Sequence, residues 1–277
     1  MTVAVGFFDG VHLGHQAILR GADVALTFKN HPLSVLAPER APRLIMSWEE
    51  RAKAIQALGV RVTAIDFNAD LAGYSPERFL EYLKEFSETH GWRPVEPLAI
   101  RCGANWRFGK GGAGDAAWLR SRGMAVTVAP YVSYAGEPIS STRIRRTLEE
   151  GRLEDAATML GRPFAVGGTV RSGKGVGRGL GYPTLNLDPD LRLNLPLGVY
   201  AVEVGSARGV ANYGFAPTMG ERAWKRPLLE VHFLSEPPPT EDAVRVAMLR
   251  YLRPERRFES LTALQEQIAA DCEEARR

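Results

Sequence analysis

The sequence predicts two domains of different class: a doubly wound parallel α/β sheet over residues 1–160, and a small antiparallel β-barrel with a C-terminal helix over residues 161–277. Two observations support this prediction. In the first part, short apolar runs alternate with helix-like stretches, as they do when strands are joined by helical crossovers. In the second part, short runs of alternating polarity follow each other closely and are broken by glycines, which is typical of antiparallel strands.

Length and composition limit the class of protein. With 277 residues, of which 45% are hydrophobic, the chain is long enough for two compact cores. A net charge of +3 suits anionic ligands but falls short of a nucleic-acid-binding protein. We expect Cys102 and Cys272 to be free thiols in a reducing cytoplasm. No secretory leader or bilayer-spanning run is visible, so we expect a soluble protein without a membrane or nucleic-acid partner.

The first domain is expected to contain five strands separated by helices. The strands are predicted at residues 3–5, 22–28, 60–67, 97–102 and 124–132, and the helices at residues 48–58, 75–86 and 116–122. In such sheets ligands bind at the carboxyl ends of the strands. The polar motifs of this domain follow these ends.

The first motif, Gly-Phe-Phe-Asp-Gly-Val-His-Leu-Gly-His at residues 6–15, comes directly after the first strand. It predicts a turn into a helix, with two histidines on one face of the first helical turn. A helix start favours phosphate oxygens, and histidines donate hydrogen bonds to charge developing on an α-phosphate. The candidate residues are Gly6, Phe8, Asp9 and Gly10 for binding a nucleoside triphosphate, and His12 and His15 for catalysis. Taken alone, the histidine pair fits a helix cap or a surface feature equally well. A zinc site is disfavoured because no cysteine cluster follows.

Two further motifs follow strands of the same sheet. Residues 27–32 read Thr-Phe-Lys-Asn-His-Pro, and the proline keeps His31 extended on a stiff loop. Residues 103–109 are rich in glycine and offer the amide of Asn105 and the aromatic ring of Phe108, which would lie against a flat ligand. Read without further information, the first is an ordinary surface loop and the second a hairpin with core aromatics.

The fourth motif predicts a helix start. A serine pair precedes a stretch with helical spacing of leucine and isoleucine, and the hydroxyl of Ser141 with the guanidinium of Arg145 would form a cradle for a triphosphate. The alternative is a plain N-cap. A second helix, residues 153–160, stops at Gly-Arg-Pro, residues 161–163, so we place the domain boundary there.

The second domain is expected to form strands and a closing helix. The strands are predicted at residues 164–170, 199–204, 209–213, 228–234 and 244–249, and the helix at residues 261–275. The glycine-dense segment 173–181 suggests a loop that covers phosphates, with Gly173, Lys174 and Gly177 as candidate ligands, although a plain connector is the alternative. In the strand at 228–234, a period of two places Glu230 on the face opposite Leu229 and Val231. The simplest interpretation of Glu230 is an outward-facing strand residue.

Taken together, these motifs resemble those of the prokaryotic bifunctional riboflavin kinase/FMN adenylyltransferase family, the FAD synthetases. Residues 8–15 resemble its form of the nucleotidyltransferase His-x-Gly-His motif, and the motifs at 27–32, 103–109 and 140–145 follow in the family's order. Residues 181–186, Gly-Tyr-Pro-Thr-Leu-Asn, resemble the Gly-x-Pro-Thr-Ala-Asn motif of riboflavin kinases. Residues 229–232 look like the Leu-Glu-Val-His strand of these kinases.

The resemblance implies a role for each motif. Residues 1–160 would transfer AMP from ATP to FMN, with Ser141 and Arg145 on the ATP phosphates and three residues lining the flavin and nucleotide cleft: His31, Asn105 and Phe108. Residues 161–277 would phosphorylate riboflavin, with Thr184 and Asn186 completing the shell of Mg²⁺ beside ATP and Glu230 taking the proton of the ribityl hydroxyl. The expected ligands are ATP, Mg²⁺, riboflavin, FMN and FAD. We expect a monomer or a weak homo-oligomer.

The chain also departs from the family pattern. Gly112 stands where we expect a basic residue, Leu185 replaces an alanine, and residues 235–239, Ser-Glu-Pro-Pro-Pro, replace an acidic residue and a Tyr-Gly pair. Only residues 16–26 separate His15 from Thr27, fewer than the usual helix and strand need. Two alternatives therefore stay open: an enzyme with only the kinase active, and a flavin-binding or regulatory scaffold without turnover.

Overall fold

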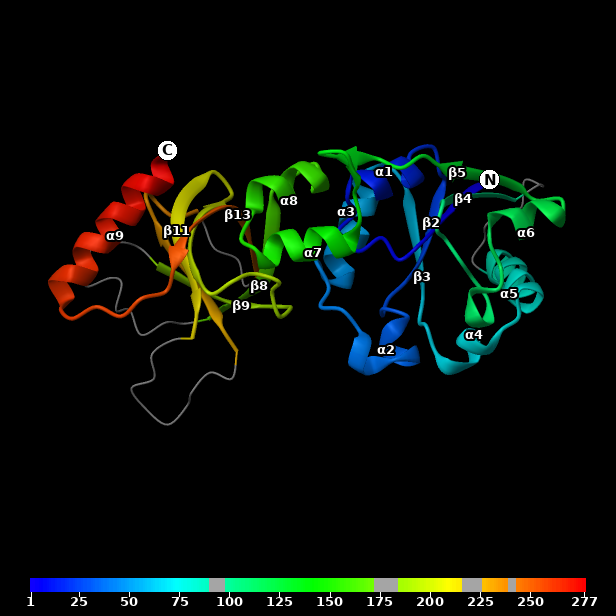
Figure 1. Cartoon of the computed structure of the whole chain (residues 1–277), viewed down its shortest axis with the longest axis horizontal. Coiled ribbons are helices and arrows are strands. Elements are labelled where there is room, and N and C mark those ends of the chain that lie inside the picture. The colour runs from blue at the N-terminus through cyan, green and yellow to red at the C-terminus, as the bar shows by residue number, and fades with distance from the viewer. Residues whose placement is uncertain (90–97, 172–183, 216–225, 239–242) are drawn as a thin grey trace. The chain divides into compact units, whose positions relative to one another are not determined.

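The computed structural model describes residues 1–89, 98–171, 184–215, 226–238 and 243–277. The chain divides into two compact units (Figure 1). One consists of Met1–Pro42 and Met46–Ser141, and the other of Arg43–Ile45 and Thr142–Arg277. The short segment Arg43–Ile45 thus belongs to the second unit although the chain on both sides of it belongs to the first. The domain boundary at residues 160/161 stays a prediction.

The first unit contains a five-stranded parallel sheet of order β3-β2-β1-β4-β5. Its strands are β1 (Thr2–Val5), β2 (Val24–Phe28), β3 (Arg61–Ile65), β4 (Ala99–Gly103) and β5 (Ala125–Ala129). The prediction of a parallel sheet is confirmed. Because the chain starts at the central strand and moves first to one edge and then to the other, the strand order reverses between β1 and β4, where open α/β sheets bind ligands.

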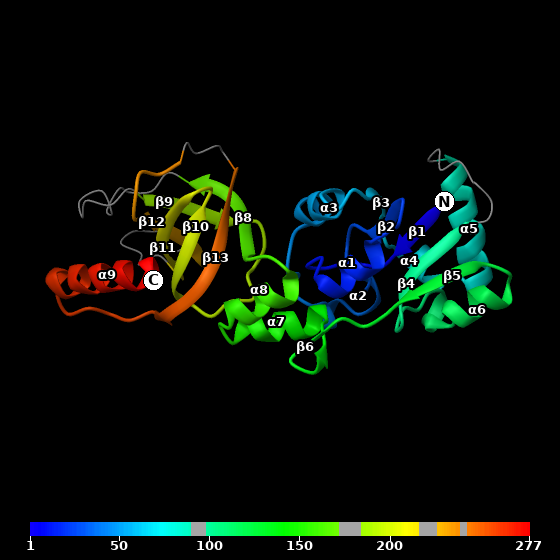
Figure 2. The same ribbon diagram turned by 90° about the horizontal axis from the view of Figure 1, so that it is seen from above.

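Helices cover both faces of this sheet, as the doubly wound class requires (Figures 1 and 2). Side chains Val3 and Val5 of β1 join a core with α5 (Pro76–Thr89) and α6 (Ala116–Ser121). Ala4, between them, joins the opposite core with α1 (Leu13–Leu19) and α3 (Trp48–Gln56). The remaining elements of this unit are short: α2 (Leu33–Leu36), η1 (Pro38–Arg40), α4 (Ala69–Gly73), η2 (Lys110–Gly112), β6 (Ser133–Tyr134) and β7 (Glu137–Pro138).

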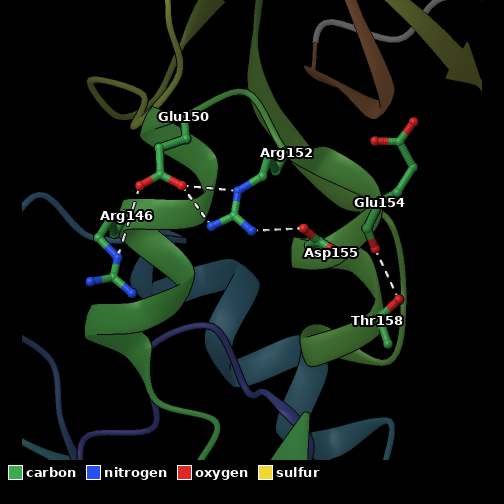
Figure 3. Close-up of polar contacts among 6 residues, drawn as sticks. All are labelled: Arg146, Glu150, Arg152, Glu154, Asp155 and Thr158. Carbon is green, nitrogen blue, oxygen red and sulfur yellow. Dashed lines mark hydrogen bonds and ion pairs between the residues drawn. The ribbon is translucent and has the colours of Figure 1, made fainter. Parts of the chain in front are cut away.

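Two helices precede the barrel, α7 (Ser141–Glu149) and α8 (Leu153–Leu160). Figure 3 shows polar contacts at the turn between them: the Arg152 guanidinium bonds the Glu150 carboxylate at 2.6 and 2.9 Å and Asp155 at 2.9 Å. Asp155 lies in the first turn of α8, where a carboxylate also complements the helix dipole. Arg152 and Glu150 are exposed and Asp155 is half-buried, so each pair is worth little by itself. At the other end, left-handed Gly161 ends α8 as predicted.

Six antiparallel strands close into a barrel of order β10-β11-β12-β9-β8-β13 (Figure 2). They are β8 (Phe164–Arg171), β9 (Thr184–Pro189), β10 (Gly198–Val204), β11 (Ala207–Gly214), β12 (Leu228–Phe233) and β13 (Ala243–Pro254). Helix α9 (Leu261–Arg276) packs Ile268, Cys272 and Ala275 against outward-facing residues of β10 and β11, among them Val199 and Val210. The predicted barrel and closing helix are confirmed. Strand β9 had not been predicted.

Candidate functional site

The turn after β1 has an unusual backbone. Phe8 and Val11 adopt φ angles of 57° and 42°, in the left-handed region that side chains with a Cβ rarely enter, and Gly10 between them has a φ of 84°. The Val11 N–H donates to the Phe8 carbonyl at 3.0 Å, which closes the predicted turn. Phe8 and Asp9 are buried, so the surrounding packing holds the strained conformation in place. Strain of this kind is concentrated at functional sites in proteins.

The two histidines of the motif lie against each other. The rings of His12 and His15 are stacked, with centroids 3.6 Å apart and an interplanar angle of 19°. His12 is the N-cap of α1, and its Nδ1 accepts the His15 backbone N–H at 3.2 Å. A Cβ at position 14 would lie 3.1 Å from the His12 ring, so Gly14 allows this close approach. The cap alternative is therefore correct for the Nδ1 atom of His12, and the catalytic role of the two histidines stays a prediction.

Ser141 joins the fourth motif to the first. Its Oγ donates to the Asp9 carbonyl at 2.8 Å, across 132 positions of sequence. Ser141 is the first residue of α7 and closes the first unit. Arg145 follows one turn later on the same helix but belongs to the second unit. Its contact with ATP stays a prediction.

His31 lies beside the same turn. Its ring meets the ring of Phe7 edge to face, with centroids 4.7 Å apart. The His31 Nδ1 accepts the Leu33 N–H at 3.1 Å, and its carbonyl accepts the N–H and the Oγ of Ser34 at 2.8 and 2.7 Å. These bonds fix the loop after β2, so the expected stiffness of the His31 segment has a concrete origin.

The glycine-rich motif after β4 divides into a core part and an exposed part. Phe108 is buried and packs against Trp106 at a centroid distance of 4.8 Å and against Phe79 at 5.3 Å. Its backbone pairs with Gly114 at 2.9 and 3.0 Å, which forms the hairpin of the alternative interpretation. Asn105 is exposed at the carboxyl end of β4. Of the two, Asn105 is the residue that the structure leaves accessible to a ligand, and both roles toward a flavin or nucleotide stay predictions.

Arg51 is a member of this region that the motifs did not reveal. It is fully buried on α3 and donates to the carbonyls of Phe7 and Phe28. A sequence signal existed, because Arg51 lies four residues before the buried Ile55 and so on the apolar face of its helix. The identity of its acceptors depends on strands far away in sequence, which no helical pattern reveals.

In the second unit, strand register gathers the predicted kinase residues on the outer face of the barrel. Asn212 of β11, Glu230 of β12 and Asn186 of β9 are directly opposite one another, and Thr184 of β9 is opposite His232 of β12. Directly opposite residues point to the same face with Cβ atoms about 5 Å apart. Thr184, Asn186 and Glu230 therefore come together although they are some 45 positions apart in the printed sequence.

The burial pattern confirms the predicted alternation. Leu229, Val231 and Phe233 are at most 2% exposed and face the barrel interior, whereas Glu230 and His232 are half-buried on the other face. Burial lowers the pKa of His232 below its usual value, and the nearby charge of Glu230 opposes this shift only in part. The imidazole of His232 is thus neutral near pH 7. Glu230 therefore has a neutral ring, and not a cation, as its neighbour on this strand.

The side chain of Asn212 is fixed by the carboxylate of Glu255, the residue that follows β13. Asn212 Nδ2 donates to Glu255 Oε1 at 3.1 Å. Thr184 is the first residue of β9, and Asn186 lies within this strand. The loop residues Gly173, Lys174 and Gly177 lie outside the described residues.

The donor set suits Mg²⁺ better than a softer metal. Within the described ranges, no group of three or more His, Cys, Asp or Glu side chains is placed to hold a metal ion. A hydroxyl and an amide oxygen on one face, at Thr184 and Asn186, fit an ion that keeps several waters and binds substrate phosphates. None of the helices in the described part of the chain has the length and apolar character needed to cross a membrane.

Comparisons with known proteins agree with this geometry. The family model described as FAD synthetase matches residues 1–143, and the one described as riboflavin kinase matches residues 160–277. Proteins named bifunctional riboflavin kinase/FMN adenylyltransferase are similar along almost the whole chain. The one from Escherichia coli (strain K12) is 32% identical over 98% of this chain and 90% of its own, and the one from Bacillus subtilis (strain 168) is 32% identical over 99% and 91%.

A solved structure supports the fold. It is described as a macrolide-efflux protein from Streptococcus pneumoniae and aligns with a TM-score of 0.83 and 29% identity over 100% of this chain and 93% of its own. The two family models together define a two-domain transferase of phosphorus-containing groups. The chain belongs to the bifunctional riboflavin kinase/FMN adenylyltransferase family.

Proposed function

We propose that the two units carry out successive steps of FAD synthesis. The barrel unit transfers the γ-phosphoryl group of ATP to riboflavin and makes FMN, and the α/β unit transfers AMP from a second ATP to FMN, with release of pyrophosphate. The observation that carries this proposal is the gathering of two separate sets of functional side chains. One set surrounds the strained turn after β1, and the other lies on the outer face of β9 and β12.

In the adenylyl transfer, a phosphate oxygen of FMN attacks the α-phosphorus of ATP and the bond to pyrophosphate breaks. His12 and His15 would donate hydrogen bonds to the charge that develops on the α-phosphate. Gly6, Phe8, Asp9 and Gly10 form the turn that shapes the phosphate site, and Ser141 holds it through the Asp9 carbonyl. Arg145, His31, Asn105 and Phe108 keep the roles that the family pattern implies. The chemistry needs no covalent intermediate, since positioning and charge stabilisation suffice.

In the kinase step, Glu230 would take the proton of the riboflavin 5′-hydroxyl as that oxygen attacks the γ-phosphorus. The neutral imidazole of His232 places no cation beside the Glu230 carboxylate. Thr184 and Asn186 would hold Mg²⁺. When bound, this ion neutralises the charge of the ATP phosphates.

The short first helix is supported from the sheet. Helix α1 has seven residues, and the Arg101 guanidinium on β4 donates to the carbonyls of Ile18 at 3.0 Å and Ala17 at 3.2 Å, near its C-terminal end. A cation there complements the helix dipole and satisfies carbonyls that lack a helical partner. This contact favours the bifunctional enzyme over one with an impaired first unit.

One incubation tests the proposal. The protein is mixed with riboflavin, ATP and Mg²⁺, and the flavins are separated by chromatography. Formation of FAD supports both steps, FMN alone supports the kinase-only alternative, and unchanged riboflavin contradicts the proposal.

We further propose that the protein acts in the cytoplasm as a monomer or weak homo-oligomer.

A further inference from the structure

Arg51 is a charged side chain without exposure to solvent. Its relative exposure is 0%, and none of the ion pairs among the described residues includes it. Burying an unpaired cation costs several kcal/mol unless hydrogen bonds compensate. The contacts that compensate this cost show what the residue does.

The Arg51 guanidinium joins the carboxyl ends of two neighbouring strands. Nη1 donates to the Phe7 carbonyl, after β1, at 3.0 Å, and Nη2 donates to the carbonyls of Phe28 at 2.6 Å and Lys29 at 3.0 Å, at the end of β2. The Phe7 carbonyl also accepts the Thr27 hydroxyl at 3.0 Å. One planar group thus sets the spacing of the two loops that follow these strands.

The same guanidinium reaches His31 through an aromatic ring. Its carbon lies 4.0 Å from the centroid of the Phe7 ring, and the Phe7 ring meets the His31 ring edge to face at 4.7 Å. The residue after Phe7 is the strained Phe8 of the phosphate turn. Displacement of Arg51 would therefore move His31 and the start of this turn together.

The start of α3 holds Arg51 in place. Ser47 caps the helix by accepting the Glu50 N–H at 3.2 Å, and the Glu50 carboxylate accepts the Ser47 N–H at 3.1 Å. This capping box fixes the first helical turn, in which Arg51 lies. The ring of Trp48 covers the guanidinium from the same helix at 5.4 Å.

We propose that Arg51 is a positioning residue for adenylyl transfer, which holds the phosphate turn and His31 in register through three strand-end carbonyls. The inference rests on the proposed function of the first unit. A lysine would supply one point charge in place of a planar fork and could not span both strand ends. A methionine would fill similar volume and leave the three carbonyls without this donor.

The test compares Arg51→Met and Arg51→Lys with wild type, and uses Lys53→Met, an exposed change on the same helix, as the matched control. Adenylylation of supplied FMN is measured as kcat and KM, and riboflavin phosphorylation by the same preparation reports on the other unit. We expect Arg51→Met to lower kcat of adenylylation on the order of 10²-fold, the usual cost of misplacing reacting groups by about 1 Å, with little change in KM. Riboflavin phosphorylation and Lys53→Met should stay at wild-type rates.

The pH dependence of Arg51→Lys supplies a readout that packing alone would not move. Burial lowers the pKa of Arg51 to about 10, against the opposing charges of Asp9 and Glu49, so the wild-type cation persists from pH 6.5 to 8.5. Burial lowers the pKa of a lysine too, and the lysine starts from a lower value. The ratio of the Arg51→Lys rate to the wild-type rate should therefore fall as pH rises through this range.

The outcomes are distinguishable. If wild type makes no FAD, the proposed function fails. If wild type makes FAD and folded Arg51→Met adenylylates FMN at the wild-type kcat, or loses both activities equally, the role of Arg51 is overturned. If Arg51→Met does not fold, the Arg51→Lys ratio decides, and a ratio independent of pH overturns the inference.

Discussion

At the scale of single residues, the environment of Glu230 defines what its carboxylate does. It lies between two amides across the strands, Asn212 and Asn186, and beside a neutral imidazole on its own strand. None of the ion pairs among the described residues includes Glu230. No cation therefore competes with an attacking hydroxyl for the oxygens of this carboxylate.

Replacing Glu230 with glutamine tests this role. General-base catalysis contributes on the order of 10²–10⁴ in rate, so Glu230→Gln should slow riboflavin phosphorylation by about that factor. Riboflavin binding should change little, because glutamine still accepts a hydrogen bond. Adenylylation of supplied FMN should not change. Glu203→Gln, on β10, serves as control, and phosphorylation by Glu230→Gln at the wild-type rate would show that Glu230 is only a strand residue.

His232 makes stability depend on pH. Its pKa is lowered by burial in the folded state, so below its unfolded pKa of about 6.5 the unfolded chain binds more protons than the folded one. The free energy of unfolding should then decrease as pH falls below about 6.5, until the folded imidazole is also protonated. Thermal unfolding midpoints at pH 7.5 and 5.5 should differ less for His232→Gln than for wild type. An equal difference would mean that other groups cause the pH dependence.

At the scale of elements, alternation of apolar and polar residues predicted most strands of the barrel. Features that depend on contacts between distant segments could not be predicted from it. Strand β9 carries the alternation needed for its prediction, with Leu185 and Leu187 buried, but this segment was interpreted only through its ligand-type residues. The position of Arg51 on the apolar face of α3 was also visible. Its three acceptors were not, because tertiary packing of β1 and β2 determines them.

The segment Arg43–Ile45 has no sequence pattern that predicts its place. Asn194, which is 2% exposed, holds it in the second unit by donating from Nδ2 to the carbonyls of Arg43 at 3.3 Å and Leu44 at 3.2 Å. A single buried amide thus satisfies two backbone acceptors of this segment.

Asn194→Ala should lower the free energy of unfolding of the full chain by about 1–3 kcal/mol, the cost of leaving buried polar groups unpaired. We predict that the fragment Arg162–Arg277 folds alone and makes FMN, and this fragment lacks Arg43 and Leu44. The same substitution should cost less there. Chemical denaturation of the four proteins measures both costs, and equal costs would refute the role of this contact.

At the scale of the whole molecule, the order of the motifs predicted two activities, and the residues predicted for them fall in different units except for Arg145, which belongs to the second unit. The class of each unit followed from local periodicity, which reports whether strands are buried on two faces or on one. The places where the chain passes between the units did not follow, because they depend on contacts between segments far apart in sequence.

Separate units predict separable activities. His12→Ala combined with His15→Ala should abolish FAD formation and leave FMN formation at the wild-type rate, because Thr184, Asn186 and Glu230 all belong to the other unit. Chromatography of the flavins after incubation with riboflavin, ATP and Mg²⁺ should then show FMN as the end product. A parallel loss of both activities would refute the division of labour.

The segment Arg43–Ile45 also changes how modules of this family would be exchanged. Because the polypeptide passes into the second unit at Arg43, leaves it after Ile45 and enters it again at Thr142, a chimera joined at one point in the sequence would place a foreign tripeptide against the barrel. A functional graft needs residues 43–45 from the same parent as the barrel. The two units are therefore not two continuous segments of the chain. Functional chimeras within the family should be those in which residues 43–45 and the barrel come from the same parent.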